Sequence, residues 1–312
     1  MRSRLFFALA LTTALLTIGL IVFGAVVRVT DSGLGCGNQW PLCNGTIIPP
    51  LDNLTAWIEW LHRLFAILIG LLGLVTLVVA MRAYRKQNSR VLAATVVAAL
   101  LFAFQSALGA LVVVLDLPPT AVTLHLGTAM LLLGALLVAA VLSTYKPRRV
   151  YGRSAFTMLA YITTALSLVV ILSGALVRGS GATLACTDWP LCNGELLPFS
   201  QGALATIHVL HRLIVVALGL SLVFLLAAAR RSAVDRRMQS LTILALVMYL
   251  AQVGVGALFV LSAAAPLWGA AHVGMAAATW ALLIVVSTFE SLNTGESRQQ
   301  TGWQQQSEPL RS

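Results

Sequence analysis

Eight long apolar segments limit this chain to a helical membrane fold. The hydrocarbon core of a bilayer is about 30 Å thick and a helix rises about 1.5 Å per residue, so one crossing needs roughly 20 apolar residues. Of the 312 residues, 59% are hydrophobic and 10% are charged, a composition foreign to soluble globular domains. The predicted spans lie near residues 5–27, 56–80, 91–115, 120–142, 155–177, 204–228, 239–261 and 266–289.

The first segment follows Arg2 and Arg4 and so has the outline of a signal peptide. Its length, the lack of a clear small-residue cleavage site and its similarity to the fifth segment favour a retained span. We therefore predict an all-α integral membrane protein with eight transmembrane helices.

The basic residues predict how the chain is oriented. Lys and Arg collect in the cytoplasmic loops of membrane proteins. Both termini are therefore expected in the cytoplasm, and the cysteine-containing loops on the outer face of a bacterial cell membrane. This bias also accounts for the net charge of +10, so the expected partner is the lipid bilayer and not nucleic acid. Sixteen of the 20 basic residues lie at the chain ends or after spans 2, 4 and 6: Arg2, Arg4, Arg82, Arg85, Lys86, Arg90, Lys146, Arg148, Arg149, Arg153, Arg230, Arg231, Arg236, Arg237, Arg298 and Arg311.

The sequence repeats after about 150 residues, as parallel-repeat transporters do. Gly-Ala-x-Val-Arg ends at Arg28 and again at Arg178, and Trp-Pro-Leu-Cys-Asn-Gly occupies 40–45 and 189–194. Four spans separate the copies, so both halves have the same orientation. This predicts two four-helix bundles related by a pseudo-twofold axis along the membrane normal. The other repeated positions are His62 and Arg63 with His211 and Arg212, and Gln105, Gly109 and His125 with Gln252, Gly256 and His272.

The repeat also predicts the domain boundaries. We expect an N-terminal half at 1–150 and a C-terminal half at 151–290. Residues 291–312 are rich in Gln and Ser and are predicted to form a disordered cytoplasmic tail. Gln105 and Gln252 are expected to join helices by hydrogen bonds and to carry no chemistry.

The four cysteines fall into two outer loops. Cys36 and Cys43 share the first, and Cys186 and Cys192 share the third. Outside a bacterial membrane two short disulfides are expected. A redox-active pair is the alternative, because a small loop is accessible to thiol exchange. Zinc is disfavoured, since neither loop contains a histidine.

The five histidines all lie near the outer ends of even-numbered spans. Pairs on facing helices of a bundle can hold a cofactor in its core, and two axial imidazoles suit a six-coordinate heme iron. The alternative for each is a hydrogen bond between helices. The arginines near the outer face are candidate partners of heme propionates, or else snorkel to the interface. The proposed ligand pairs are His62 with His125 and His211 with His272, and the candidate propionate partners are Arg28, Arg63, Arg178 and Arg212.

The two halves differ at one informative position, where Glu59 of the first aligns with His208 of the second. Glu59 precedes His62 by three residues, so its carboxylate is expected beside the cofactor, where it would exchange a proton. Its alternative is a hydrogen-bond partner for an imidazole. The asymmetry predicts a reacting site in the first half and an electron-transfer site in the second.

Together these motifs resemble the bacterial heme A synthase family over about residues 10–290. The residues that carry the resemblance are the cysteine loop, Glu59-Trp60-Leu61-His62-Arg63 and the repeated histidines. The resemblance implies oxidation of the C8 methyl of heme O to the formyl group of heme A, by two hydroxylations and loss of water.

The same resemblance implies the residue roles. His62 and His125 would bind the substrate heme O, and His211 and His272 a heme b. Glu59 and the Cys36–Cys43 pair would serve catalysis, and the Cys186–Cys192 pair would be structural. His208 departs from some relatives and leaves open whether it, rather than His211, binds iron.

Heme O synthase is then the expected upstream partner and cytochrome oxidase assembly the destination, while the electron acceptor is not identified by the sequence. A diheme b-type electron carrier would explain the histidines as well, but it leaves Glu59 and the outer cysteines without a role. A transporter is disfavoured, since no Gly/Pro break interrupts a span near the midplane.

Overall fold

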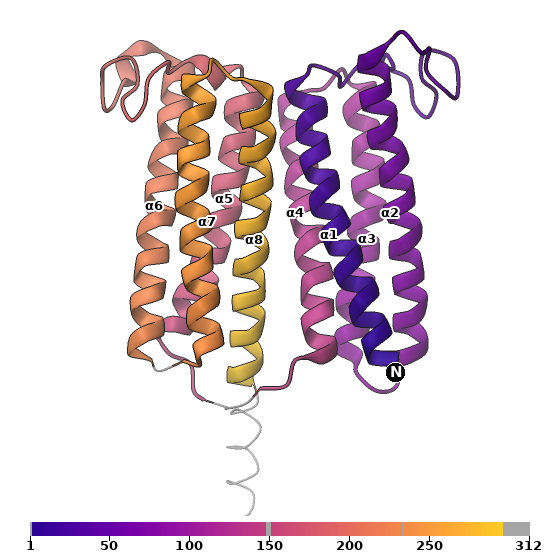
Figure 1. Ribbon diagram of the computed structural model, residues 1–312, viewed down its shortest axis with the longest axis vertical. Coiled ribbons are helices and arrows are strands. Elements are labelled where there is room, and N and C mark those ends of the chain that lie inside the picture. Colours follow the sequence, from indigo (N-terminus) through magenta and orange to yellow (C-terminus); the bar gives the residue numbers. More distant parts are fainter. Residues whose placement is uncertain (1, 148–150, 233, 296–312) are drawn as a thin grey trace, which may run out of the picture.

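The computed structural model describes residues 2–147, 151–232 and 234–295, and these contain eight helices long and apolar enough to cross a membrane (Figure 1). The predicted all-α fold with eight spans is confirmed, and no strand occurs in these residues. The long helices are α1 (Arg2–Val29), α2 (Leu54–Tyr84), α3 (Ser89–Val114), α4 (Pro119–Thr144), α5 (Ala155–Gly179), α6 (Ala203–Arg231), α7 (Arg236–Leu261) and α8 (Pro266–Gly295).

Local signals fix where several helices begin. The side chain of Asn53 accepts a hydrogen bond from the backbone N–H of Ala56 at the start of α2, and Asp235 does the same for Met238 in α7. Pro119 occupies the first turn of α4, where its missing N–H is not needed. Such caps satisfy donors that a helix leaves open at its N-terminus.

The helices pack in two rings. In the first, α1 contacts α2, α2 contacts α3, α3 contacts α4, and α4 contacts α1; α5 to α8 repeat this pattern. The rings meet where α1 packs on α8, α4 on α5, and α4 on α8 (Figure 1). The pairing is compatible with the expected pseudo-twofold axis between α4 and α8. Within each ring, α2 and α4, or α6 and α8, therefore lie on a diagonal.

Burial follows this arrangement. The window of α4 that could span the membrane is the most buried of the eight, because α4 packs within its own ring and against α5 and α8. Large apolar side chains on α2, α3 and α6, such as Leu71, Leu100 and Phe224, are exposed. A continuous apolar exterior is what a helix bundle offers to lipid.

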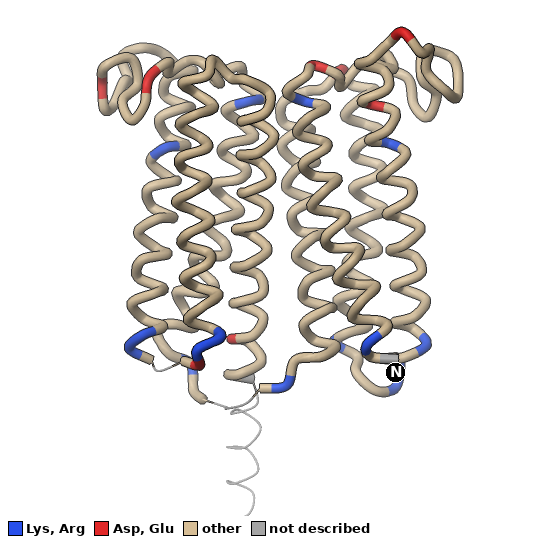
Figure 2. The backbone as a smooth tube through the Cα atoms, in the orientation of Figure 1, with Lys and Arg blue, Asp and Glu red and all other residues tan. Residues whose placement is uncertain are grey.

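Charge separates the two ends of the molecule. Basic residues gather at the end that holds the N-terminus, and the middle of the bundle is almost free of charge (Figure 2). We call this end, defined by Arg85, Lys86, Lys146, Arg231 and Arg236, the basic end. The opposite end carries segments 30–53 and 180–202 and is called the loop end.

The predicted tail differs from the structure at its beginning. Residues 291–295 continue α8, and the remaining tail, 296–312, lies outside the described residues. The helix extends because two of its polar side chains are bonded: Asn293 accepts from the hydroxyl of Tyr145 (2.9 Å), and Glu290 accepts from that of Tyr151 (2.5 Å).

One hydrogen bond crosses the contact between α4 and α8. The indole of Trp280, which is 4% exposed, donates to the backbone oxygen of Met130 over 2.8 Å. We expect Trp280→Phe to destabilise the contact by about 1–3 kcal/mol, through the lost bond and a cavity. Thermal unfolding in detergent measures this. Trp268→Phe is the matched control on the same helix, and equal loss of stability in both variants would contradict the prediction.

Candidate functional site

The four repeated histidines lie on the diagonals of the two rings. His62 is on α2 and His125 on α4; His211 is on α6 and His272 on α8. Helices on a diagonal face each other across the ring axis, so each pair approaches the bundle core from opposite sides.

Each of these imidazoles lies against a glycine of a neighbouring odd-numbered helix. A Cβ atom on that glycine would come within about 3 Å of the imidazole carbon Cε1, closer than nearly all real Cβ contacts. No residue larger than glycine fits without displacing the ring. The distances from such a Cβ to Cε1 are 3.1 Å for Gly24 and His62, 3.0 Å for Gly109 and His125, 3.1 Å for Gly174 and His211, and 2.9 Å for Gly256 and His272.

In the second half, hydrogen bonds fix both rings. Nδ1 of His211 lies 2.8 Å from the Ser173 hydroxyl, which itself donates to the backbone oxygen of Val170. Ser173 therefore accepts from Nδ1–H. Nδ1 of His272 donates to the backbone oxygen of Gln252 over 3.2 Å. Both rings are thereby held in the tautomer that leaves the lone pair of Nε2 free to bind a metal.

In the first half this anchoring is missing. Nδ1 of both His62 and His125 is buried without a hydrogen-bond partner in the described part of the chain. The position that corresponds to Ser173 at the offset of 150 is Phe23, whose ring meets His62 edge-on with centroids 5.8 Å apart. Phe23 has no hydroxyl that could accept from Nδ1–H, as Ser173 does.

The repeated glutamines, Gln105 and Gln252, also make different contacts in the two halves. The side chain of Gln252 accepts a long hydrogen bond from Thr279 (3.5 Å), whereas that of Gln105 lies 3.2 Å from Nε2 of His125. At the offset of 147, Leu132 stands where the second half has Thr279. Both glutamines contact the neighbouring helix, as expected, but the Gln252 side chain accepts where the amides were expected to donate, and Gln105 contacts the imidazole nitrogen that would bind a metal.

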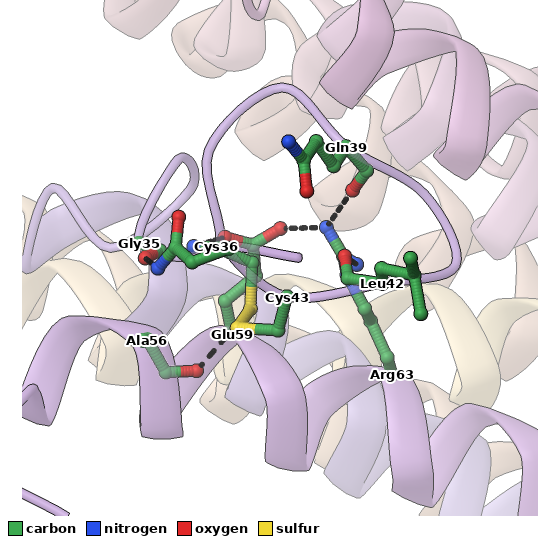
Figure 3. Close-up of polar contacts among 9 residues, drawn as sticks. Gly35, Cys36, Gln39, Leu42, Cys43, Ala56, Glu59 and Arg63 are labelled. Atoms are coloured by element: carbon green, nitrogen blue, oxygen red, sulfur yellow. Dashed lines mark hydrogen bonds and ion pairs between the residues drawn. A yellow bond between two sulfur atoms is a disulfide. The ribbon is translucent and has the colours of Figure 1, made fainter. Parts of the chain in front are cut away.

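Glu59 connects the first turns of α2 to the cysteine loop (Figure 3). The residue is buried, with 3% of its surface exposed. One carboxylate oxygen accepts from the backbone N–H of Cys36 over 2.9 Å, and the other pairs with the Arg63 guanidinium. The carboxylate charge is thus compensated inside the protein, as a buried charge requires.

Arg63 holds the loop over the helix (Figure 3). Its guanidinium donates to the backbone oxygens of Leu42 (3.2 Å) and Gln39 (3.1 Å) as well as to Glu59. Only Nε remains buried and unpaired. Most of the donors that a propionate would need are therefore used by the loop.

Both expected disulfides are present, Cys36–Cys43 and Cys186–Cys192. All four cysteines have no exposed surface. Thiol exchange with an outside partner therefore requires the loop to open. The contact of 3.6 Å between the Cys36 sulfur and the Ala56 oxygen is not a hydrogen bond, because a disulfide sulfur carries no proton.

His208 takes the place of Glu59 in the second half. Its Nδ1 donates to the backbone oxygen of Ala182 (2.9 Å), and its Nε2 accepts from Arg212 (3.3 Å). Arg212 in turn donates to the backbone oxygens of Asp188, Pro190 and Leu191. Both ring nitrogens of His208 are occupied, which favours His211 as the ligand.

Arg28 and Arg178 lie where the halves meet. Arg178 donates to the backbone oxygen of Arg28 (3.1 Å) and pairs with Asp31 (3.3 Å). The Nε atoms of both arginines are buried without a partner. These donors make them the better-placed candidates for an anionic group of a bound molecule.

The chemistry of the donor set fits heme and not a bare metal ion. No group of three or more His, Cys, Asp or Glu converges among the described residues. A porphyrin brings four nitrogens of its own, so two imidazoles complete its iron.

Sequence reasoning named the histidines but missed Ser173 and Phe23. The signal was present: aligning the halves places serine beside one repeated glycine and phenylalanine beside the other. The importance of this difference becomes clear only in the structure, where both side chains contact a repeated histidine.

Residues 7–284 match the COX15-CtaA family, described as cytochrome oxidase assembly protein. The heme A synthase of Geobacillus kaustophilus is 32% identical over 270 residues, 83% of this chain and 82% of that protein. That of Symbiobacterium thermophilum is 32% identical over 273 residues, 84% and 88% of the two chains. That of Alkalihalophilus pseudofirmus is 32% identical over 228 residues, 70% and 75% of the two chains.

The glycine contacts generate a matched test. Gly256 and Gly254 lie on α7, but a Cβ on Gly254 would meet nothing within 4 Å. We expect Gly256→Ala to push the His272 ring aside and to lower heme retention about tenfold or more, because displaced ligand geometry weakens metal binding. Heme content per protein after purification measures this. Gly254→Ala should retain heme as the unaltered protein does, and equal retention by Gly256→Ala would refute the contact as a constraint.

Proposed function

Because the chain belongs to the COX15-CtaA family of cytochrome oxidase assembly proteins and aligns with bacterial heme A synthases over most of its length, we infer that it is a heme A synthase. Its substrate in this proposal is heme O and its product is heme A. Two successive hydroxylations of the C8 methyl give a diol, and loss of water leaves the formyl group. In this proposal each hydroxylation takes its oxygen atom from water and releases two electrons and two protons. An external electron acceptor would take the electrons, by way of the second half.

The observation that carries the assignment of the halves is the unequal anchoring of the imidazoles. Ser173 and the Gln252 carbonyl hold the second-half rings ready to ligate, as suits a resident heme b. The rings of His62 and His125 lack such anchors, as suits a heme that must enter and leave. We therefore propose residues 1–150 as the substrate half and 151–290 as the heme b half.

Glu59 supplies the charge for the reacting site. His62, which would hold a heme in the first half, follows Glu59 by three residues on α2, so the carboxylate would lie on the same side of the helix as that heme. Removal of electrons from the methyl carbon builds positive charge there, which a fixed carboxylate stabilises or relieves by taking a proton. The bonds from Cys36 and Arg63 keep the carboxylate in place, so the Cys36–Cys43 loop acts on the site through Glu59.

The arginines have two roles in this proposal. Arg63 and Arg212 mainly fasten the cysteine loops, with Nε of Arg63 left for a propionate. Arg28 and Arg178 have unpaired donors at the junction of the halves and would pair with propionates.

The distribution of charge supports an orientation with the basic end in the cytoplasm and the loop end outside (Figure 2). Both described helix ends nearest the termini, the start of α1 and the end of α8, lie at the basic end (Figure 1). Heme O synthase is the proposed source of substrate, because passing so apolar a molecule through water is unfavourable.

The function is tested by expressing this chain with heme O synthase in a host that makes no heme A, followed by heme extraction and mass detection. Heme A or its hydroxymethyl precursor should appear only when this chain is present. Bound heme b with no modified heme, while heme O is available, would instead indicate a diheme electron carrier.

The role of Glu59 is tested in the same host. Glu59→Gln should reduce product at least tenfold, because the amide is neutral, while heme retention and folding persist. Glu195→Gln, which removes a carboxylate from the exposed third loop, is the matched control and should leave product unchanged. Full product from Glu59→Gln would exclude the proposed role.

The unequal anchoring predicts opposite effects in the two halves. Ser173→Ala should lower heme retention in the second half by about 10-fold to 100-fold and raise the midpoint potential of that heme, because the imidazole becomes a weaker donor. Phe23→Ser should strengthen retention in the first half by supplying an acceptor to His62. Potentiometric titration and heme counting measure both effects. Ser106→Ala, on the exposed face of α3, is the control, and identical potentials in all variants would contradict the assignment.

A further inference from the structure

A cavity of about 630 Å³ opens at the basic end between the two halves, and no histidine is among its lining residues. It is lined by α1, α4, α8 and the start of α7. Its deeper wall is apolar and includes Leu11, Leu137 and Val285; its mouth is formed by polar groups, among them Lys146, Asp235 and Arg237. The cavity is therefore amphipathic along its depth.

The tilt of α1 explains why the space exists. α1 packs on α8 but slants away from it toward the basic end (Figure 1). The segment before α5, in contrast, is tied to α8, because Tyr151 donates to Glu290 and its backbone N–H donates to the oxygen of Asn293. Nothing among the described residues bridges α1 and α8 in this way at the cavity.

The charges at the mouth are unbalanced. Lys146 and Arg237 are exposed, and neither forms an ion pair in the described part of the chain. Asp235 offsets one of them, but its carboxylate is engaged in capping α7 through the N–H of Met238 (2.9 Å). Among the described residues that line the cavity, the formal charges sum to one net positive charge.

Arg237 is held at the mouth by aromatic rings. Its guanidinium carbon lies 4.4 Å from the ring centroid of Phe289 and 5.8 Å from that of Tyr145. Stacking of this kind leaves the N–H groups at the edge of the guanidinium free to donate to an anion.

We propose that this cavity binds one anionic phospholipid from the surrounding leaflet. An acyl chain fills the apolar depth between α1, α4 and α8, and the phosphate lies between Lys146 and Arg237. Interiors of proteins are close-packed, and an apolar space of this size beside lipid is filled more favourably by an acyl chain than by water. The net positive charge matches a headgroup with one negative charge and repels the cationic group of a zwitterionic lipid.

To test this, the full-length protein is reconstituted into nanodiscs that contain equal amounts of phosphatidylcholine and phosphatidylglycerol, and is then released from them. Native mass spectrometry of the released protein should show one retained phosphatidylglycerol. Lys146→Gln combined with Arg237→Gln should lower its retention about tenfold or more. The matched control, Lys86→Gln with Arg90→Gln, removes two cations from the same end but outside the cavity, and should retain the lipid.

A second variant tests the apolar depth with the charges intact. Leu11→Trp fills the cavity and should exclude the lipid. If this variant does not fold, the charge variants alone decide.

The proposal would be overturned by retention of phosphatidylcholine equal to that of phosphatidylglycerol, by equal loss in the control pair, or by the absence of retained lipid in the unaltered protein. Displacement by inorganic phosphate or glycerophosphoglycerol at millimolar concentration would show a headgroup site without a chain, and would also overturn it.

Discussion

The close approach of four imidazoles to four glycines is the contact on which the arrangement of the site depends. With a hydrogen in place of a Cβ at Gly24 or Gly256, the ring of the next helix can lie against the backbone. A larger residue would push the ring or the helix outward, and the opposed pair across the bundle would lose its common depth. The ring packing of helices supplies the rest, because it sets α2 opposite α4 and α6 opposite α8.

Duplication of this scaffold leaves the two halves alike in backbone and different in polar chemistry. Ser173 gives the His211 ring an acceptor, whereas Phe23 contacts His62 with an aromatic ring that carries no hydroxyl. Thr279 engages Gln252, whereas Gln105 turns onto His125. A few substitutions at equivalent places thus distinguish a pair of rings held by hydrogen bonds from a pair that is not. In our proposal this difference lets one fold keep one cofactor and exchange another.

At the loop end, too, the two halves share one arrangement but differ in their polar contacts. Each cysteine loop is fastened to a helix by an arginine that donates to loop carbonyls. In the first half the arginine is paired with a buried carboxylate, and in the second with a neutral imidazole nitrogen. A buried charge retained beside a compensating cation costs stability relative to apolar packing, so its presence in one half alone indicates a use.

The sequence by itself determined the number and approximate positions of the helices, the internal repeat, the paired cysteines and the positions of the histidines. The length of an apolar segment and the spacing between repeated motifs can be read from the sequence alone, without knowledge of the fold. Only the tertiary structure decided that both nitrogens of His208 are occupied, that the Arg63 guanidinium binds its loop, that α8 continues to Gly295 and that a cavity opens beside Lys146. These depend on contacts between residues far apart in the chain, and helix tilt and packing, which no local pattern encodes, create them.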